Sequence, residues 1–397
     1  MKLKQSCFIL VITLFIVTSA ALPALGEIIL GQSCALSGPT SFLGTQMNKG
    51  ALAYFNNQKD DIILKALDDK YEPVQCIKNT RTFIKKKVTA LFGYVGTPTS
   101  KVAVPLATKD KMIFFGGFTG AGFLSAYKTN PYTFSLRGSY NAEIENMVRH
   151  LKEDLNITKI GLFVQRDAFG IAGIKGAVKA VNTITGVSIV PAVPDIPADD
   201  APTDKWEAFW EMVPNYKRNT VAVGLNARKL CGYQVEAVIL VGAYRPCATA
   251  INIWHERNLN AIFINISFVG SMGLAERCKS LKNVYISQVM PSPWDGTLPV
   301  VKEYQTALGS DFGFVSLEGY VAAKVFHKAL IDAGANPNAE TIKTALESMS
   351  AYDAGGLKIS YGASDHRGLE STYLTKLEKK NGGFRFIYVD TLTRDPQ

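Results

Sequence analysis

The chain has 397 residues, of which 47% are hydrophobic, 10% aromatic and 19% charged, a composition that excludes an intrinsically disordered protein and provides for large cores. At about 150 residues per domain, two or three domains are expected. Lysine and arginine (43) exceed aspartate and glutamate (34), giving a net charge of +9. The basic residues are scattered, and the one tight run, Lys85 to Lys87, is typical of a solvated helix end, so no nucleic-acid partner is expected.

Residues 1–26 are predicted to be a signal peptide. Lys2 and Lys4 precede a short apolar run, Phe8 to Val17, and small residues follow, with cleavage expected near Gly26. The ten residues of that run are few for a stable membrane span, and no other segment reaches the required length of about 18 residues. The sequence therefore predicts a protein exported to a bacterial periplasm.

Apolar strands alternate with amphipathic helices in the first part of the chain after residue 26. Strands are expected at 27–35, 61–67, 88–93 and 112–116, and helices at 41–58, 73–86 and 99–109. This alternation with short connections predicts a parallel sheet that helices cover on both faces.

The same alternation restarts further along the chain. Helices are expected at 141–154 and 171–185, then one ending near residue 230 and another at 247–257; strands are expected at 159–164, 187–190, 237–241 and 261–264. The sequence thus predicts an α/β fold built from two Rossmann-like units with parallel central sheets.

Loops rich in glycine, hydroxyl and aromatic residues follow the predicted strands. They cover residues 32–39, 93–100 and 116–121 in the first unit and 165–170 and 242–244 in the second. Any one of these loops could be an ordinary turn or helix cap. Because ligands of open parallel sheets bind at the carboxyl ends of the strands, five such loops together predict one shared cleft.

Five cysteines lie after residue 26: Cys34, Cys76, Cys231, Cys247 and Cys278. None has CxxC spacing and the four histidines are scattered, so no metal site is expected. Cys34 follows the first strand and Cys76 the second, so one interpretation is a disulfide between them and the other is two buried thiols.

No nucleophile elbow, phosphate loop, zinc-protease or dinucleotide motif is present, and neither a cofactor nor catalysis is expected.

Short motifs follow one another in order between residue 28 and about residue 388. They include GQSCALSGP (31–39), FGYVGTPTS (92–100), FFGGFTGA (114–121), VGAYRPC (241–247), SFVGSMGLA (267–275) and SLEGYVAAKVF (316–326). In this order the sequence resembles the type I periplasmic binding proteins, specifically the leucine/isoleucine/valine-binding branch of ABC-importer receptors.

The resemblance implies two lobes joined by three crossovers near residues 137–141, 288–291 and 361–367. Lobe one would comprise residues 27–138 and 290–362, and lobe two residues 139–289 and 363–397, including extra strands at 371–376 and 384–388. Such a protein would be a monomer that closes over a small solute and delivers it to a cognate ABC-type inner-membrane permease.

The resemblance also implies a set of ligand contacts. They are Ser37, Thr97, Thr99, Ser100, Phe118, Thr119 and Ala121 from lobe one, and Tyr140, Phe169, Tyr244 and Met272 from lobe two. Met272 stands where amino-acid-binding relatives usually carry an acid that pairs with the ammonium group. A zwitterionic ligand therefore requires another acid, such as Asp167, because an unpaired buried ammonium is costly.

For Asp167, Arg137 and the segment 191–216, the sequence allows two interpretations each. Asp167 either replaces the missing acid or caps the following helix. Arg137 either reaches an acidic ligand or pairs with Glu143 or Asp311. The segment 191–216, which has six acidic residues as well as Trp206, Phe209 and Trp210, is either a surface helix on lobe two or a lid or permease-docking element.

The function expected from these features is that of a transport receptor for a small polar or amphipathic solute, such as an amino acid or a related carboxylate or amide. A ligand-sensing module of the same fold is the first alternative, and an exported enzyme is the second. Reversible, stoichiometric binding would distinguish the receptor from the enzyme.

Overall fold

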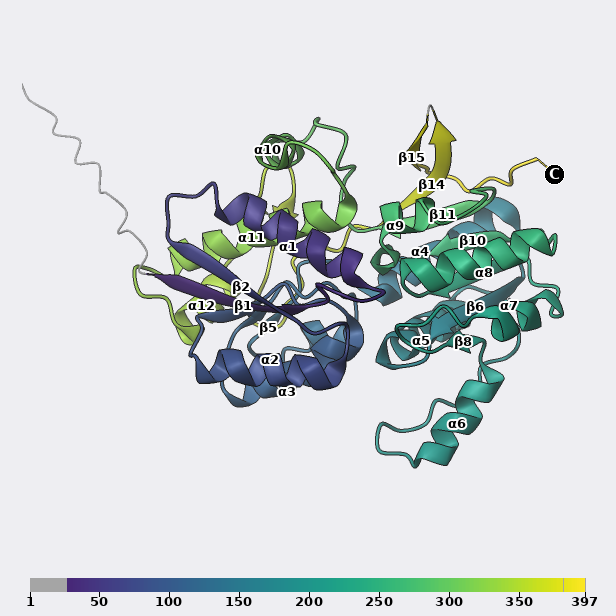
Figure 1. The fold of residues 1–397 in the computed structure, drawn as a ribbon, viewed down its shortest axis with the longest axis horizontal. Helices are drawn as coiled ribbons and strands as arrows, with labels where there is room; N and C mark the ends of the chain where they lie inside the picture. The colour runs from purple at the N-terminus through teal and green to yellow at the C-terminus, as the bar shows by residue number, and fades with distance from the viewer. Residues whose placement is uncertain (1–26, 381, 397) are drawn as a thin grey trace, which may run out of the picture.

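The computed structural model describes residues 27–380 and 382–396, so the predicted signal peptide lies outside the described residues. Within these ranges, no helix combines the length and the apolar character that crossing a membrane requires. The described chain forms two α/β units side by side, each built around its own central sheet (Figure 1).

The first sheet has the strand order β2-β1-β3-β4-β5 and is parallel throughout. Its strands are β1 (Ile28–Cys34), β2 (Ile62–Asp68), β3 (Ala90–Phe92), β4 (Phe114–Phe115) and β5 (Thr133–Phe134). Helices α2 (Pro73–Lys85) and α3 (Thr97–Lys109) cover one face, and α1 (Ser41–Phe55) covers the other (Figure 1). With helices on both faces, the central strands are continuously apolar and buried, as the sequence predicts.

The second sheet has the order β15-β14-β11-β10-β9-β6-β7, with β8 also pairing with β6. Its strands are β6 (Lys159–Gln165), β7 (Ser188–Ile189), β8 (Asn215–Tyr216), β9 (Ala237–Val241), β10 (Ile262–Asn265), β11 (Val284–Gln288), β14 (Tyr373–Lys380) and β15 (Gly383–Tyr388). Its helices are α4 (Tyr140–Leu155), α5 (Ala168–Thr183), α7 (Gly224–Cys231), α8 (Tyr244–Glu256) and α9 (Ser271–Ala275). The central strands are parallel as predicted, whereas β14 and β15 add an antiparallel edge.

The chain returns to the first unit after β11. It forms α10 (Pro299–Leu308), α11 (Phe314–Asp332) and α12 (Ala339–Glu347), followed by the short pair β12 (Tyr352–Asp353) and β13 (Lys358–Ile359). Helix α11 packs closely on α1 through glycines. A Cβ atom on Gly50 would lie 1.8 Å from the Ser316 carbonyl oxygen, and one on Gly319 would lie 2.3 Å from the Met47 carbonyl oxygen.

Three passages connect the two units. The first joins β5 to α4, the second follows β11, and the third leads from β13 to β14. The first and third run together, because the Ser135 N–H donates to the His366 carbonyl (2.8 Å) and the Gly368 N–H donates to the Ser135 carbonyl (2.9 Å). These passages overlap the segments predicted as crossovers, 137–141, 288–291 and 361–367.

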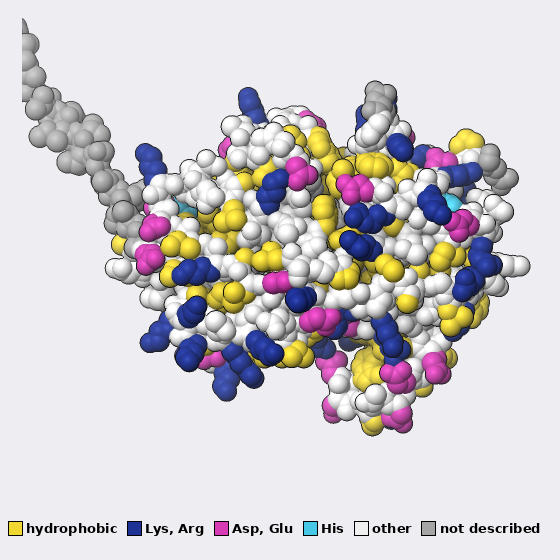
Figure 2. Space-filling view, viewed as in Figure 1, with side chains coloured by type: hydrophobic (Ala, Val, Ile, Leu, Met, Phe, Trp, Pro, Cys, Tyr) yellow, Lys and Arg dark blue, Asp and Glu magenta, His cyan; other side chains and the backbone are white. Residues whose placement is uncertain are grey.

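The segment 191–216 contains α6 (Thr203–Met212), which projects from the body beyond α5 (Figure 1). Trp206 and Trp210, four residues apart, stack with their ring centroids 6.3 Å apart. The segment returns to the second sheet through β8, whose Asn215 pairs with Val164 of β6. Acidic side chains gather on the projecting part (Figure 2).

Candidate functional site

The first wall of the candidate site is the amino end of α3. The helix begins at Thr97, two residues before the predicted start, because Pro98 suits its first turn and Gly96 adopts a φ of 101° just before it. A side chain at Gly96 would collide with the ring of Tyr71, 2.0 Å from the Cβ position. The Thr97 hydroxyl is hydrogen-bonded to that of Thr119 at 2.7 Å, which joins the helix to the loop after β4.

The second wall is the amino end of α5. This helix begins at Ala168, three residues earlier than predicted, because Asp167 caps it by accepting a hydrogen bond from the Phe169 N–H at 2.9 Å. The Asp167 carboxylate also accepts from the Gln165 side chain at 2.8 Å and from Arg218 at 3.0 Å. Burial raises the pKa of Asp167, and the charge of Arg218 opposes that rise. Asp167 therefore caps α5, and its role towards a ligand stays a prediction.

Aromatic side chains fill the space between the carboxyl ends of the two sheets. The Phe268 ring lies 4.6 Å from Phe169, 5.4 Å from Phe118 and 6.0 Å from Tyr71, centroid to centroid. Tyr140 adjoins Phe169 at 5.5 Å. All five side chains are buried. They form a continuous apolar contact between the two units.

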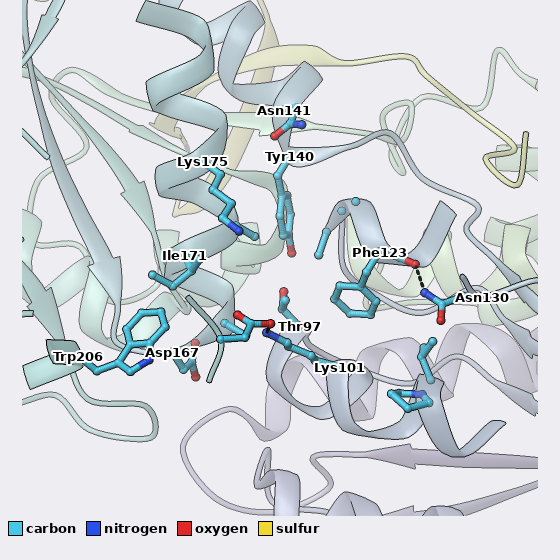
Figure 3. A pocket seen from close by; sticks show the side chains of 18 of the residues that line it. Thr97, Lys101, Phe123, Asn130, Tyr140, Asn141, Asp167, Ile171, Lys175 and Trp206 are labelled. Atoms are coloured by element: carbon cyan, nitrogen blue, oxygen red, sulfur yellow. Dashed lines mark hydrogen bonds and ion pairs between the residues drawn. The ribbon is translucent and has the colours of Figure 1, made fainter. Parts of the chain in front are cut away.

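A cavity of about 820 Å³ lies beside this aromatic cluster (Figure 3). Three walls border this open cavity: a face of α3 with the loop after β4, a face of α5, and the segment 191–216. The lining residues include Thr97, Lys101, Val104, Ala121, Phe123, Tyr140, Asp167, Ile171, Lys175, Asp199, Trp206 and Trp210. The volume is within the range of about 300–1,000 Å³ that is usual for small-molecule sites.

Thr97, Ala121, Tyr140 and Asp167 are the predicted contacts that line this cavity. The Tyr140 ring descends into it towards Thr97 (Figure 3). Burial raises the pKa of Tyr140 to about 12, while the nearby Arg137 and Thr119 oppose that rise, so the phenol is neutral at physiological pH. Its hydroxyl is buried, with Thr119 and Arg137 as its polar neighbours.

The other predicted lobe-one contacts do not line the cavity. Ser37 is exposed and donates its hydroxyl to Asp68. The Thr99 hydroxyl donates to the Val95 carbonyl at 2.6 Å, within its own helix terminus. Phe118 belongs to the aromatic cluster and Thr119 stands behind Thr97. The Ser100 hydroxyl is buried and has no hydrogen-bond partner within the described chain.

The remaining predicted lobe-two contacts also lie apart from the cavity. Phe169 is part of the aromatic cluster, and Met272 is half-buried on α9. Tyr244 crosses between the units, because its hydroxyl donates to the Pro39 carbonyl at 2.7 Å while Arg277 covers its ring at 4.9 Å. That Phe169, Tyr244 and Met272 contact a ligand stays a prediction.

Arg137 lies fully buried at the first crossover and does not line the cavity. Its Nε is 3.0 Å from a carboxylate oxygen of Glu318, and its Nη2 donates to the Ser267 hydroxyl at 2.8 Å. Ser267 in turn donates to Glu143 through its hydroxyl (2.8 Å) and its backbone N–H (2.9 Å). Pairing with Asp311 is wrong, since Asp311 binds the exposed Lys49 at 2.8 Å. Arg137 thereby links both units at their hinge.

Further polar contacts join the units along the rim of the cleft. Arg218 of the second unit reaches Glu72 of the first at 2.7 Å, and the Gln165 side chain donates to the Tyr71 hydroxyl at 3.2 Å. On the cavity side, Lys101 of α3 pairs with Asp199 of the segment 191–216 at 2.8 Å. The two units are therefore closed upon one another.

Sequence reasoning missed Lys101, Lys175, Phe123 and Trp206 as cavity-lining residues. The signal available was helical spacing. Residues 97, 101, 104 and 105 form one face of α3, and residues 168, 171, 172 and 175 form one face of α5. Each face begins at the observed helix start and accounts for Lys101 and Lys175, whereas Phe123 and Trp206 come from other segments.

Cys34 and Cys76 are free and buried, so the interpretation as two thiols holds and the structure contains no disulfide between them. Burial raises the pKa of Cys76 to about 12, and its sulfur contacts the Thr99 carbonyl oxygen at 3.5 Å. No group of His, Cys, Asp or Glu suited to a metal ion occurs in residues 27–380 or 382–396.

The fold has two sheets whose central strands are parallel, three connections between them, and a cavity lined from both units. These features define the class of two-lobed solute-binding proteins. The family model of the periplasmic binding proteins matches residues 27–383, and the chain belongs to this family. This confirms the resemblance noted in the sequence. No curated protein sequence matches the chain at a significant level.

Solved structures of the same fold cover nearly the whole chain. A possible leucine/isoleucine/valine-binding protein from Rhodopirellula baltica is 30% identical, with a TM-score of 0.78 over 93% of this chain and 98% of its own. A substrate-binding periplasmic protein from Ralstonia solanacearum is 26% identical (TM-score 0.77; 91% and 100% covered). The branched-chain amino acid transporter substrate-binding protein of Streptococcus pneumoniae, solved with isoleucine, is 16% identical (0.71; 92% and 100%) and shares the fold.

Proposed function

We propose that the protein is the periplasmic receptor of an ABC importer, a monomer that binds a small solute between its lobes without transforming it. Lobe one comprises residues 27–138 and 290–362, and lobe two comprises residues 139–289 and 363–397. The observation that carries the proposal is a cavity of about 820 Å³ with walls from both units. A permease in the inner membrane would recognise the closed pair of lobes and accept the solute.

Closure follows from how the contacts are distributed. The units are joined through the three passages, of which the first and third are paired through Ser135. The cavity-side ion pair between Lys101 and Asp199 is exposed, so it contributes no more than about 1 kcal/mol. This cavity-side contact can break and re-form as a solute enters and leaves, and solute bound to both walls would favour the closed form.

A melting-temperature screen of the protein without residues 1–26 tests the proposal. Amino acids, keto acids, aromatic acids, sugars and amides are each added at millimolar concentration. A true solute at 100 times its Kd should stabilise the fold by about 2.7 kcal/mol, and mass spectrometry should recover it unchanged. Conversion of the solute would contradict the receptor and favour an enzyme; the absence of any stabilising compound would contradict solute binding itself.

A further inference from the structure

Positive charge is concentrated at one end of the first unit. Residues 73–111 contain eight lysine and arginine residues and one acidic residue, Asp110. These cations are spread along the sequence, but α2 and α3 lie side by side on one face of the first sheet and bring them together (Figure 1). Figure 2 shows lysine and arginine side chains gathered over these two helices. We call the six cations at the carboxyl-terminal ends of the helices the basic end: Arg81, Lys85, Lys86, Lys87, Lys109 and Lys111.

The cations of the basic end are available to a partner. All six residues are exposed. Lys101, which lines the cavity, pairs with Asp199 at 2.8 Å, whereas none of the six forms an ion pair with an acid in residues 27–380 or 382–396. The segments 81–87 and 109–111 and the residues just before β1 and β2 hold three exposed acids, Asp110, Glu27 and Asp61. The cations therefore outnumber these acids two to one, and net positive charge is left uncompensated at this end.

The basic end lies where β1 begins, away from the cavity. Thr89, two residues after Lys87, exchanges hydrogen bonds with Ile29 of β1: its N–H donates to the Ile29 carbonyl at 2.7 Å, and its hydroxyl accepts from the Ile29 N–H at 3.3 Å. Lys111 likewise lies just before β4, whereas the cavity is lined by the amino-terminal part of α3. The predicted signal peptide, residues 1–26, joins the chain at this same end, immediately before Glu27.

These features fit an anionic lipid surface. Five of the six cations are lysines, whose ammonium groups act as point charges and require no fixed geometry of the partner. Phe83, the one aromatic residue in α2 and α3, is buried, so the helices present no ring for stacking on nucleic-acid bases. The predicted signal peptide brings this end of the chain to the inner membrane during export, and a membrane with anionic headgroups attracts clusters of lysine.

We propose that the basic end binds the anionic phospholipids of the inner membrane at its periplasmic face and holds the protein there by electrostatic attraction. Such attraction extends about 8 Å at physiological salt, so the contact is reversible and sensitive to ionic strength. It would concentrate the protein at the membrane that holds the permease. The proposal goes beyond the proposed function and does not depend on it, because the basic end contributes no residue to the cavity.

Co-sedimentation of residues 27–397 with lipid vesicles tests the proposal. One set of vesicles contains equal parts of phosphatidylglycerol and phosphatidylcholine, and the other contains phosphatidylcholine alone. The protein should sediment with the first set at low salt, stay in solution with the second, and be released from the first at about 1 M salt, where the Debye length falls to about 3 Å. Equal binding to both sets, binding that salt leaves unchanged, or no binding to the anionic vesicles would overturn the proposal.

A triple variant locates the contact. Lys85→Gln, Lys86→Gln and Lys109→Gln together remove half of the cations of the basic end and affect both helices. A lysine near an anionic membrane surface contributes about fivefold to binding, which corresponds to about 1 kcal/mol. The triple variant should therefore bind the phosphatidylglycerol vesicles at least about tenfold more weakly than the parent. Binding as strong as that of the parent would show that the contact lies elsewhere, and the proposal would be refuted.

A second triple variant controls for net charge. Lys179→Gln, Lys217→Gln and Lys229→Gln remove the same charge from exposed positions of the second unit, and this protein should bind the vesicles nearly as the parent does. If both triple variants bind equally weakly, the overall charge of the protein is responsible and the proposal fails. Melting temperatures close to that of the parent exclude unfolding as the cause. Stabilisation by a solute should be the same in all three proteins, so the vesicle assay and the melting screen test the two proposals separately.

Discussion

Replacing Arg137 by methionine removes the positive charge at the hinge and leaves two carboxylates without it. Arg137 is 1% exposed, and its partner Glu318 and the neighbouring Glu143 are buried. Removing one partner of a buried ion pair costs about 3–5 kcal/mol, because the other charge stays desolvated. The guanidinium also covers the Phe118 ring at 4.5 Å. We therefore expect Arg137→Met to lower the free energy of unfolding by about 3–5 kcal/mol.

Equilibrium unfolding in urea measures this loss, and two further variants serve as controls. Asp311→Asn breaks the exposed pair with Lys49 and should cost less than about 1 kcal/mol. The double variant Arg137→Met, Glu318→Met removes the ion pair as a unit and should recover much of the stability. A loss for Arg137→Met no larger than that for Asp311→Asn would refute the assignment of Arg137 as the charge that holds the hinge.

The same cluster gives a pH dependence with a defined sign. Burial raises the pKa of Glu318 from its ordinary 4.5 to about 7, and Arg137 opposes that rise. Between these values the folded protein keeps a proton that the unfolded chain releases, so stability falls as pH rises from about 4.5 to about 7. Without Arg137 the penalty should grow, so Arg137→Met should lose more stability at pH 8 than at pH 5. An equal loss at both values would contradict this reasoning.

Three further predictions concern packing, closure and thiols. Gly50→Ala should lower the free energy of unfolding by about 1–3 kcal/mol or more, because its Cβ would meet the Ser316 carbonyl, whereas Gly362→Ala, in open space, should be nearly neutral in the same urea titration. Tyr244→Phe should weaken binding of the most stabilising solute about 2- to 10-fold by calorimetry, since it removes one hydrogen bond between the units; an unchanged Kd would show that this bond does not hold them closed. Cys34 and Cys76 should resist alkylation in the native protein and react fully after unfolding without reductant; a requirement for reductant would reveal a disulfide.

The strands and helices were largely predictable because each has a local pattern. The predicted strand 159–164 and the observed β6 differ by one residue, as do the predicted helix 73–86 and the observed α2. The predicted first residues of helices were less accurate where a capping residue or a proline determines where the helix begins. Pro98 and Asp167 explain why α3 and α5 begin two and three residues earlier than the apolar period indicates.

The site was less predictable because its geometry depends on contacts distant in the sequence. Lys101 forms an ion pair with Asp199. Arg137 forms one with Glu318, and not with the expected partners Glu143 or Asp311. No local sequence pattern specifies either pairing. Phe118 and Phe169 follow strands as ligand contacts would, yet their rings contact Phe268 and fill the space between the sheets. Whether an aromatic residue lines a cavity or fills it is decided by the packing of both units together.

Small-angle X-ray scattering of residues 27–397, with and without a saturating solute from the melting screen, tests lobe closure most directly. If the lobes turn about the three passages and shut on the solute, the radius of gyration should fall on binding and the scattering should match the closed arrangement described here. An unchanged radius of gyration, with calorimetry showing the solute bound, would contradict closure over the cavity.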